Sequence, residues 1–204
     1  ASNRRKFRGF SPARHHYTRL RANLQDACKF AIIPADKKEG ESTVSIEKVR
    51  AYFAQFGMEK RILEFDVSSA TVELAAQAVG VEGKQIAKTL SFLLGDACIL
   101  IVAAGDARVD NKKYKEHFGL KAKMLAHDDV PEYIGHTVGG VCPFSVKDGV
   151  KVYLDESLKR FETVFPAAGS ANSAIELTIP ELEKYSKFDG WVDVCKDWRT
   201  DAEG

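Results

Sequence analysis

Two apolar segments joined by a two-residue turn constrain the fold of this chain more than any other feature. In the first segment, Leu90, Phe92 and Leu94 alternate as they would on one face of a strand that starts near Lys88. Gly95-Asp96 suits a tight hairpin turn. The run CILIVAA (98–104) follows, and such an uninterrupted apolar run is typical of a strand buried on both faces. The sequence therefore predicts a hairpin whose second strand lies inside the core.

Lys88 lies on the same strand face as these apolar side chains, because side chains alternate with a period of two. An unpaired ammonium is costly to desolvate, so the parity alone favours a lysine that extends to solvent at the strand edge. The alternative is that Lys88 points into a pocket and meets an anionic or carbonyl group of a ligand. The pattern leaves both interpretations open.

Helical and strand patterns surround this hairpin. Residues 72–79 place apolar side chains on one face of a helix, which Gly80 ends and which Ser68 or Ser69 caps. Together the patterns predict an α+β fold, with a mixed, mostly antiparallel sheet curled toward a barrel and helices outside it. Further helices are expected at 46–56, 111–118, 129–134 and from 180 onward, and further strands at 61–66, 150–157, 164–169 and 173–179.

Composition restricts the class of protein. The chain has 204 residues, of which 45% are hydrophobic and 29% charged, and no apolar run is long enough to span a bilayer. Its four cysteines form no Cys-x-x-Cys pair, which argues against a zinc site or a disulfide framework and for a reducing compartment. A Walker loop and a strand-linked G-x-G-x-x-G are missing. We therefore expect a cytoplasmic protein without a cofactor, a metal or a membrane anchor.

Two basic regions stand out. Residues 1–43 hold ten Lys/Arg against four Asp/Glu and show no sustained apolar period, whereas residues 44–204 are net acidic. The first region is interpreted as an extension to the domain at 44–204. It could bind nucleic acid, but a solvated tail or residues foreign to the natural protein fit better. The second region is the helix that carries Lys112, Lys113 and Lys115, which is either a solvated face or a contact for RNA phosphates.

A family resemblance adds to this reading. GVEGKQIAKTLSF (80–92) resembles the signature of the YbaK family, which includes the editing domain inserted in bacterial prolyl-tRNA synthetases, around Lys88-Thr89-Leu90. GHTVGGVCPF (135–144) resembles the family's Gly-x-x-x-Pro loop, with Gly139 and Pro143 in the matching places. FPAAGSANSAIELT (165–178) resembles its late strand pair. The three motifs occur in the family's order, and the resemblance as a whole covers roughly residues 44–191.

The resemblance implies a site. Lys88 would hold a phosphate or polarise an ester carbonyl, and the amides around Gly139 and Gly140 would support an oxyanion or the ribose. The attacking water would be helped by a ribose hydroxyl of the substrate, so that no protein nucleophile is needed. Other substrate contacts are expected from residues of the same motifs or near them: Thr71, Thr89, His136, Pro143, Gly169, Asn172 and Ser173.

The function implied by the resemblance is that of a free-standing aminoacyl-tRNA deacylase, which removes a wrong small amino acid from tRNA, in the family mostly proline tRNA. Ala167-Ala168-Gly169, Ala174 and Thr71 depart from the type that handles cysteine, so cysteine specificity is not expected. The expected partners are aminoacyl-tRNA and, as a second candidate, a synthetase, but not DNA. The alternative is a module that binds aminoacyl-tRNA or a synthetase without hydrolysis. A thiol hydrolase built on Cys142 and His136, or a metal site at residues 127–129, is a weaker alternative.

Overall fold

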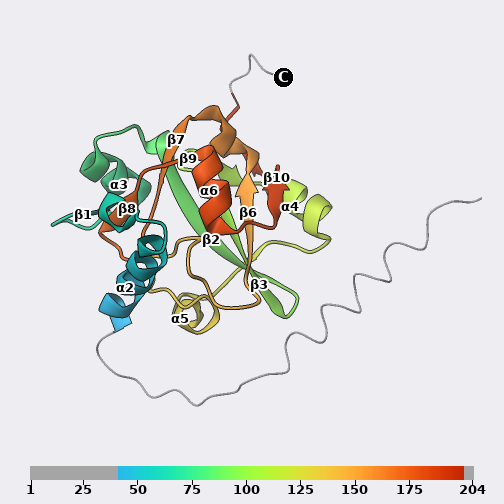
Figure 1. Cartoon of the computed structure of the whole chain (residues 1–204). Coiled ribbons are helices and arrows are strands. Elements are labelled where there is room, and N and C mark those ends of the chain that lie inside the picture. Colours follow the sequence, from blue (N-terminus) through green and yellow to red (C-terminus); the bar gives the residue numbers. More distant parts are fainter. Residues whose placement is uncertain (1–40, 200–204) are drawn as a thin grey trace, which may run out of the picture. The chain divides into compact units, whose positions relative to one another are not determined.

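The computed structural model describes residues 41–199 as a curled mixed sheet with helices around it (Figure 1). The helices are α2 (Glu41–Ala54), α3 (Val72–Val79), α4 (Asn111–Phe118), α5 (Val130–Tyr133) and α6 (Ile179–Ser186). Short 3-10 helices are η1 (Glu59–Arg61), η2 (Gly83–Gln85), η3 (His127–Asp129) and η4 (Glu156–Arg160). The strands are β1 (Ile62–Glu64), β2 (Ile86–Leu94), β3 (Ala97–Ala104), β4 (Arg108–Val109), β5 (Lys123–Met124), β6 (Lys151–Asp155), β7 (Thr163–Pro166), β8 (Ser173–Ile175), β9 (Leu177–Thr178), β10 (Gly190–Val192) and β11 (Cys195–Lys196).

The main sheet has the order β10-β6-β3-β2-β7-β9, with β5 paired to the far end of β2. The β2–β3, β2–β5 and β7–β9 pairs are antiparallel, whereas β3–β6, β6–β10 and β2–β7 are parallel. Two further antiparallel pairs, β1–β8 and β4–β11, lie outside this sheet. The predicted α+β class with a curled, mixed sheet is thus confirmed.

The predicted hairpin forms the centre of the sheet. Leu94 pairs with Ala97 across the turn, and Gly95 takes the positive φ of 65° that this tight turn requires. Every residue of β3 from Cys98 to Ala104 is buried, because β2 and β6 flank the strand and the two faces of the sheet are covered. The prediction of a strand buried on both faces is confirmed.

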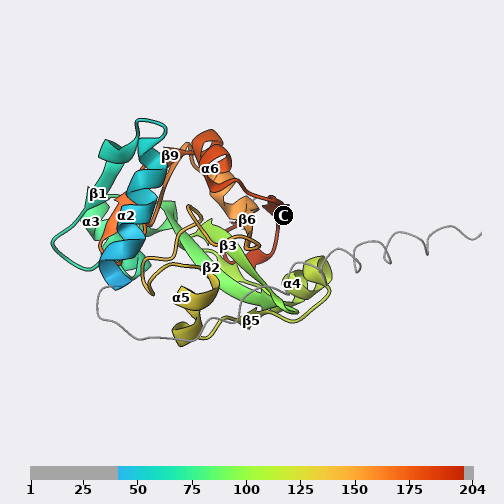
Figure 2. The same ribbon diagram turned by 60° about the horizontal axis from the view of Figure 1, so that its bottom comes forward.

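The helices lie on different sides of the sheet. Figure 2 shows α2 and α3 together at one side and α4 at the opposite side. Gly80 ends α3 in the left-handed conformation, as predicted, but the predicted caps are wrong. Thr71 caps α3, its hydroxyl accepting from the Leu74 amide at 3.2 Å, while the Ser69 hydroxyl donates to the Ala171 carbonyl at 3.2 Å. A serine that bonds to a distant loop is not available to the helix.

Two predicted boundaries also differ. The strand expected at 173–179 divides at Glu176: β8 pairs with β1, and β9 pairs with β7. At the division, the Glu176 carbonyl accepts a hydrogen bond from Arg61. The expected limit at residue 44 falls inside α2, which begins at Glu41.

The expectations for residues 1–40 lie outside the described residues. Within 41–199 no helix is both long and apolar enough to cross a bilayer.

Candidate functional site

Two predicted site residues, Lys88 and Gly139, lie near the N-terminal end of α3. A Cβ atom on Gly105 would lie 2.0 Å from the Gly83 carbonyl oxygen and 2.7 Å from Val72 Cγ1, so Gly105 packs directly against this end of α3. A Cβ atom on Gly139 would lie 3.5 Å from the Cβ of Ala70, the residue before the helix cap. The Gly139 loop and the end of β3 therefore both contact the N-terminal end of α3.

Lys88 joins this arrangement through its ammonium group. Its Nζ donates a hydrogen bond to the Gly105 carbonyl at 2.9 Å, and its side chain is half-buried. Burial lowers the pKa of Lys88, while the nearby Cys195 and Asp106 act in the opposite direction. Lys88 is therefore neither free in solvent nor fully buried, and its ammonium is held at the end of β3. An ammonium has three donor hydrogens, so two remain after the bond to Gly105.

The Gly139 loop is a tight turn. The Gly140 amide donates to the Thr137 carbonyl at 3.1 Å, and Gly139 has a φ of 85°, the pattern of a type II turn with glycine at its third position. Gly140 is buried against Ser170, so its amide does not face a substrate, and the predicted role for that amide is corrected. Within the described part of the chain, no acceptor bonds to the Gly139 amide.

His136 closes the base of this loop. Its Nε2 donates to the Phe144 carbonyl at 2.8 Å, which makes Nδ1 the acceptor for the Ser45 hydroxyl at 2.9 Å. The side chain is 1% exposed, and burial lowers its pKa. The prediction that His136 contacts substrate is therefore corrected: the ring links the start of the loop to its end and to α2.

The weaker thiol-hydrolase alternative does not fit this geometry. Cys142 Sγ lies 3.9 Å from both ring nitrogens of His136, so the two residues do meet. Burial raises the pKa of the Cys142 thiol to about 12, and both histidine nitrogens already have partners. A thiol in this state is a poor nucleophile. Among the described residues, no cluster of His, Cys, Asp and Glu could hold a metal ion.

Three other predicted contacts are structural. The Asn172 side chain donates to the Phe65 carbonyl at 2.9 Å and accepts from the Ser170 hydroxyl at 2.9 Å. The Ser173 hydroxyl is buried and bonds to Ser170. Gly169 has a φ of 96°, and a Cβ there would lie 2.7 Å from the Ser45 carbonyl oxygen. These residues support the loop beneath Gly139, which corrects their predicted role as substrate contacts.

The remaining predicted contacts lie in three different places. Thr71 is exposed, but its hydroxyl is used as the α3 cap. Thr89 lies on the opposite strand face from Lys88, and its hydroxyl is buried without a hydrogen-bond partner. Pro143 is buried at the end of the Gly139 loop. Gly105 was not predicted as a site residue, although it ends the apolar run of the buried strand and begins a Gly-Asp-x-x-Val-Asp segment that resembles the family's.

The three lysines of α4 differ in whether their ammonium groups already have partners. Lys113 Nζ donates to Asp193 Oδ1 at 2.9 Å and to the Cys195 carbonyl at 3.0 Å, so it fastens α4 to the C-terminal strands. Its ammonium is thus already paired within the fold, and an RNA contact through Lys113 stays a prediction. Lys112 and Lys115 are exposed.

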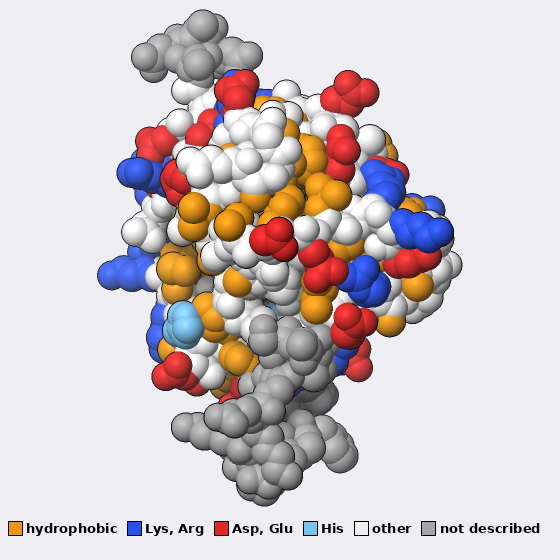
Figure 3. All heavy atoms as spheres, turned by 90° about the vertical axis from the view of Figure 1, so that its left-hand side faces the viewer, with side chains coloured by type: hydrophobic (Ala, Val, Ile, Leu, Met, Phe, Trp, Pro, Cys, Tyr) orange, Lys and Arg blue, Asp and Glu red, His pale blue; other side chains and the backbone are white. Residues whose placement is uncertain are grey.

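The surface around β1 and α3 carries exposed apolar side chains. Leu63, Val67 and Leu74 are exposed large hydrophobic residues in or next to β1 and α3. Figure 3 views the molecule from this side and shows hydrophobic side chains in the middle of the face, with acidic and basic side chains around them.

Comparisons with known proteins identify the family of this chain. The model of the aminoacyl-tRNA editing domain family matches residues 67–185, which contain α3, Lys88 and the Gly139 loop. "Uncharacterized protein YwhH" of Bacillus subtilis is 56% identical over 156 residues, covering 76% of this chain and 99% of that protein. A proline–tRNA ligase of Limosilactobacillus fermentum is 27% identical over 176 residues, and the match covers 81% of this chain but only 30% of the ligase.

A solved structure has a similar fold. The crystal structure of "a putative trans-editing enzyme for prolyl tRNA synthetase" matches with a TM-score of 0.68 and 28% identity, covering 74% of this chain and 97% of that one. The family match spans more than half of the chain, and it includes the elements that carry Lys88 and Gly139. The chain belongs to the family of aminoacyl-tRNA editing domains.

Proposed function

We propose that this protein is a trans-acting deacylase that hydrolyses the ester between a wrong amino acid and tRNA, with a small amino acid on proline tRNA as the substrate. Membership of the editing-domain family supports the reaction class. The match to proline–tRNA ligases over less than a third of their length supports proline tRNA. The reaction would take place in the cytoplasm, where tRNA is charged.

One observation carries the proposal: Lys88 and Gly139 both lie by the N-terminal end of α3. The ammonium of Lys88 keeps two donor hydrogens for a phosphate or an ester carbonyl of the substrate. The Gly139 amide supplies a further donor for the developing oxyanion or for the ribose. The partial positive charge at the helix end adds to both. Since an aminoacyl ester is already reactive, positioning a water molecule beside these donors is enough for hydrolysis.

A binding module without activity is the second candidate. It is favoured by the buried Cys142 thiol and by His136, whose nitrogens are both occupied, because neither can act as a nucleophile or a general base. In the deacylase, a substrate hydroxyl would take that role.

A panel of mischarged tRNAs separates the two candidates. Purified protein is incubated with proline tRNA carrying alanine, serine, threonine or cysteine, and with correctly charged prolyl-tRNA as the control. Release of a small amino acid faster than in buffer supports the deacylase, and we expect cysteine to be a poor substrate. Tight binding of every tRNA with no turnover on any would establish the binding module instead.

A further inference from the structure

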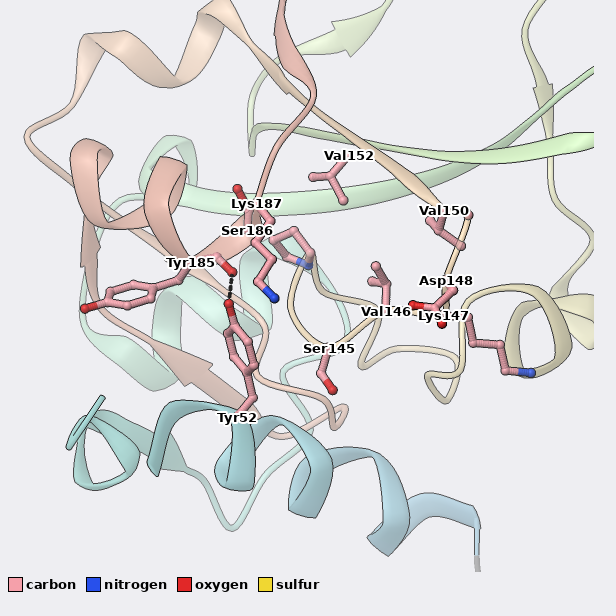
Figure 4. Close-up of a pocket in the computed structure, with 12 residues that line it drawn as sticks. Tyr52, Ser145, Val146, Lys147, Asp148, Val150, Val152, Tyr185, Ser186 and Lys187 are labelled. Carbon is pink, nitrogen blue, oxygen red and sulfur yellow. Dashed lines mark hydrogen bonds between the residues drawn. The ribbon is translucent and has the colours of Figure 1, made fainter. Parts of the chain in front are cut away.

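A pocket separate from the α3 end lies between α2, α6 and the loop that follows Pro143. Its volume is about 380 Å³, which lies in the range of small-ligand sites. Figure 4 shows Tyr52 of α2 on one side, with its hydroxyl donating to the Tyr185 carbonyl at 2.9 Å, and Ser145 beside it. The Lys187 ammonium lies 5.5 Å from the Tyr52 ring centroid.

Two residues of this pocket have an uncommon backbone conformation. Ser145 has a φ of 52° and Lys187 a φ of 50°, and both line the pocket. Glycine is the residue usually found in the left-handed conformation after a helix, which is where Lys187 stands. A side chain kept at such a position often serves a function.

The charges of α6 point to an anionic ligand. Its acidic side chains are used internally, because Glu181 pairs with Arg61 and Glu183 accepts from the Trp191 indole. Its C-terminal lysines lie over aromatic rings instead. Lys184 Nζ is 5.1 Å from the Tyr185 ring centroid, and within residues 41–199 neither Lys184 nor Lys187 forms a salt bridge.

We propose that this pocket binds one nucleotide of a single-stranded RNA segment, with its phosphate at Lys187 and its base against the Tyr52 ring. Lysines interleaved with aromatic rings are the usual means of binding single strands. Asp148 also lines the pocket, and its carboxylate can accept from the amino group of a base such as cytosine. The proposal rests on the proposed function, which supplies the RNA. Pro143 lines the pocket and also ends the Gly139 loop, so the pocket follows that loop directly along the chain. The single-stranded 3′ end of the tRNA would run from the Gly139 loop into the pocket.

Binding of a labelled oligocytidylate tests the proposal. The full chain is titrated against a strand of about twelve nucleotides, and fluorescence anisotropy is followed at about 50 and about 200 mM salt. Lys187→Asn removes the charge while keeping a residue that tolerates a positive φ. We expect severalfold weaker binding at low salt and a smaller salt dependence. Tyr52→Leu removes the stacking surface, and we expect about tenfold weaker binding.

Lys159→Asn is the matched control. Its ammonium also lies over an aromatic ring, 4.3 Å from the Trp191 centroid, but it pairs with Glu156 and lines no part of this pocket. Unchanged affinity in this variant, together with the loss in Lys187→Asn, supports the pocket. Equal affinity of Lys187→Asn and the wild type overturns it, as does an equal loss in both lysine variants. The oligonucleotide carries no ester, so the result is independent of whether the protein hydrolyses aminoacyl-tRNA.

Discussion

At the scale of single residues, Lys88 carries the main prediction about activity. The Lys88→Ala variant should lose most deacylation, about a hundredfold or more, as when an oxyanion donor is removed. Lys88→Arg should recover only part of it, because a planar guanidinium replaces a compact donor. Initial rates on a mischarged tRNA measure both effects.

Lys84→Ala is the matched control for this prediction. Lys84 is an exposed lysine in η2, directly before the same strand, and it pairs with Glu82. This variant should keep full activity. All three proteins should unfold within a few degrees of the wild type. Full deacylation by folded Lys88→Ala would remove the lysine from the mechanism.

The ion pair between Arg61 and Glu181 gives a prediction about pH. The hydrogen bond from Arg61 lowers the pKa of Glu181 to about 2. The pair therefore stabilises the fold above the ordinary carboxyl pKa of about 4.3, and this stabilisation is lost as the pH falls toward 2. Arg61→Gln should raise the Glu181 pKa toward its ordinary value, as followed by NMR titration of the carboxyl carbon. An unchanged pKa would mean that the capping bonds from Thr178 lower it alone.

At the residue scale, the roles of Lys88 and Gly139 stay predictions, whereas the structure shows that several polar residues around them are already hydrogen-bonded within the fold. Strand parity predicted that Lys88 shares a face with apolar side chains, and the family resemblance singled out Gly139. Asn172 bonds to Phe65, which is 107 positions away along the chain. A local pattern cannot show that a polar side chain already has a distant partner.

At the scale of elements, α4 carries the prediction for RNA binding. Replacing Lys112 and Lys115 with alanine should weaken tRNA binding and reduce its salt dependence by about two counterions. Lys113→Ala should instead lower thermal stability, since its ammonium bonds to Asp193 and Cys195. Filter binding at several salt concentrations, with melting curves, distinguishes the two classes. An unchanged salt slope in the double variant would place the RNA elsewhere.

Element prediction was most reliable where the signal was local. The helix predicted at 111–118 forms as α4, with Asp110 and Gly119 capping its two ends, because both residues act within one turn of their own helix. The prediction of a single strand at 173–179 was wrong because the partners of this segment are distant in the sequence. A single alternating pattern cannot show that its two halves pair with strands from different parts of the chain, β1 and β7.

At the scale of the whole molecule, the start of α2 decides how much of the chain the domain needs. A protein lacking residues 1–40 should keep its thermal midpoint within a few degrees, since those residues show no sustained apolar period. Removing 1–43 also deletes the start of α2 and brings a charged terminus next to Ser45, the partner of His136. That cut should cost about 1 kcal/mol more, or about 2–4 °C. Equal midpoints would show that the first turn of α2 contributes nothing.

The position of β3 has a consequence for exchange with solvent deuterium. Ile99 to Val102 pair with β2 on one edge and β6 on the other, and all four are 0% exposed. No small opening motion can release such amides, so they should exchange only when the whole domain unfolds, and they then report its global stability. Binding of RNA or of a substrate analogue at the surface should slow their exchange by the factor with which binding stabilises the folded state. The amides of the two-residue strand β5, on the edge of the same sheet, should exchange by local opening and respond much less.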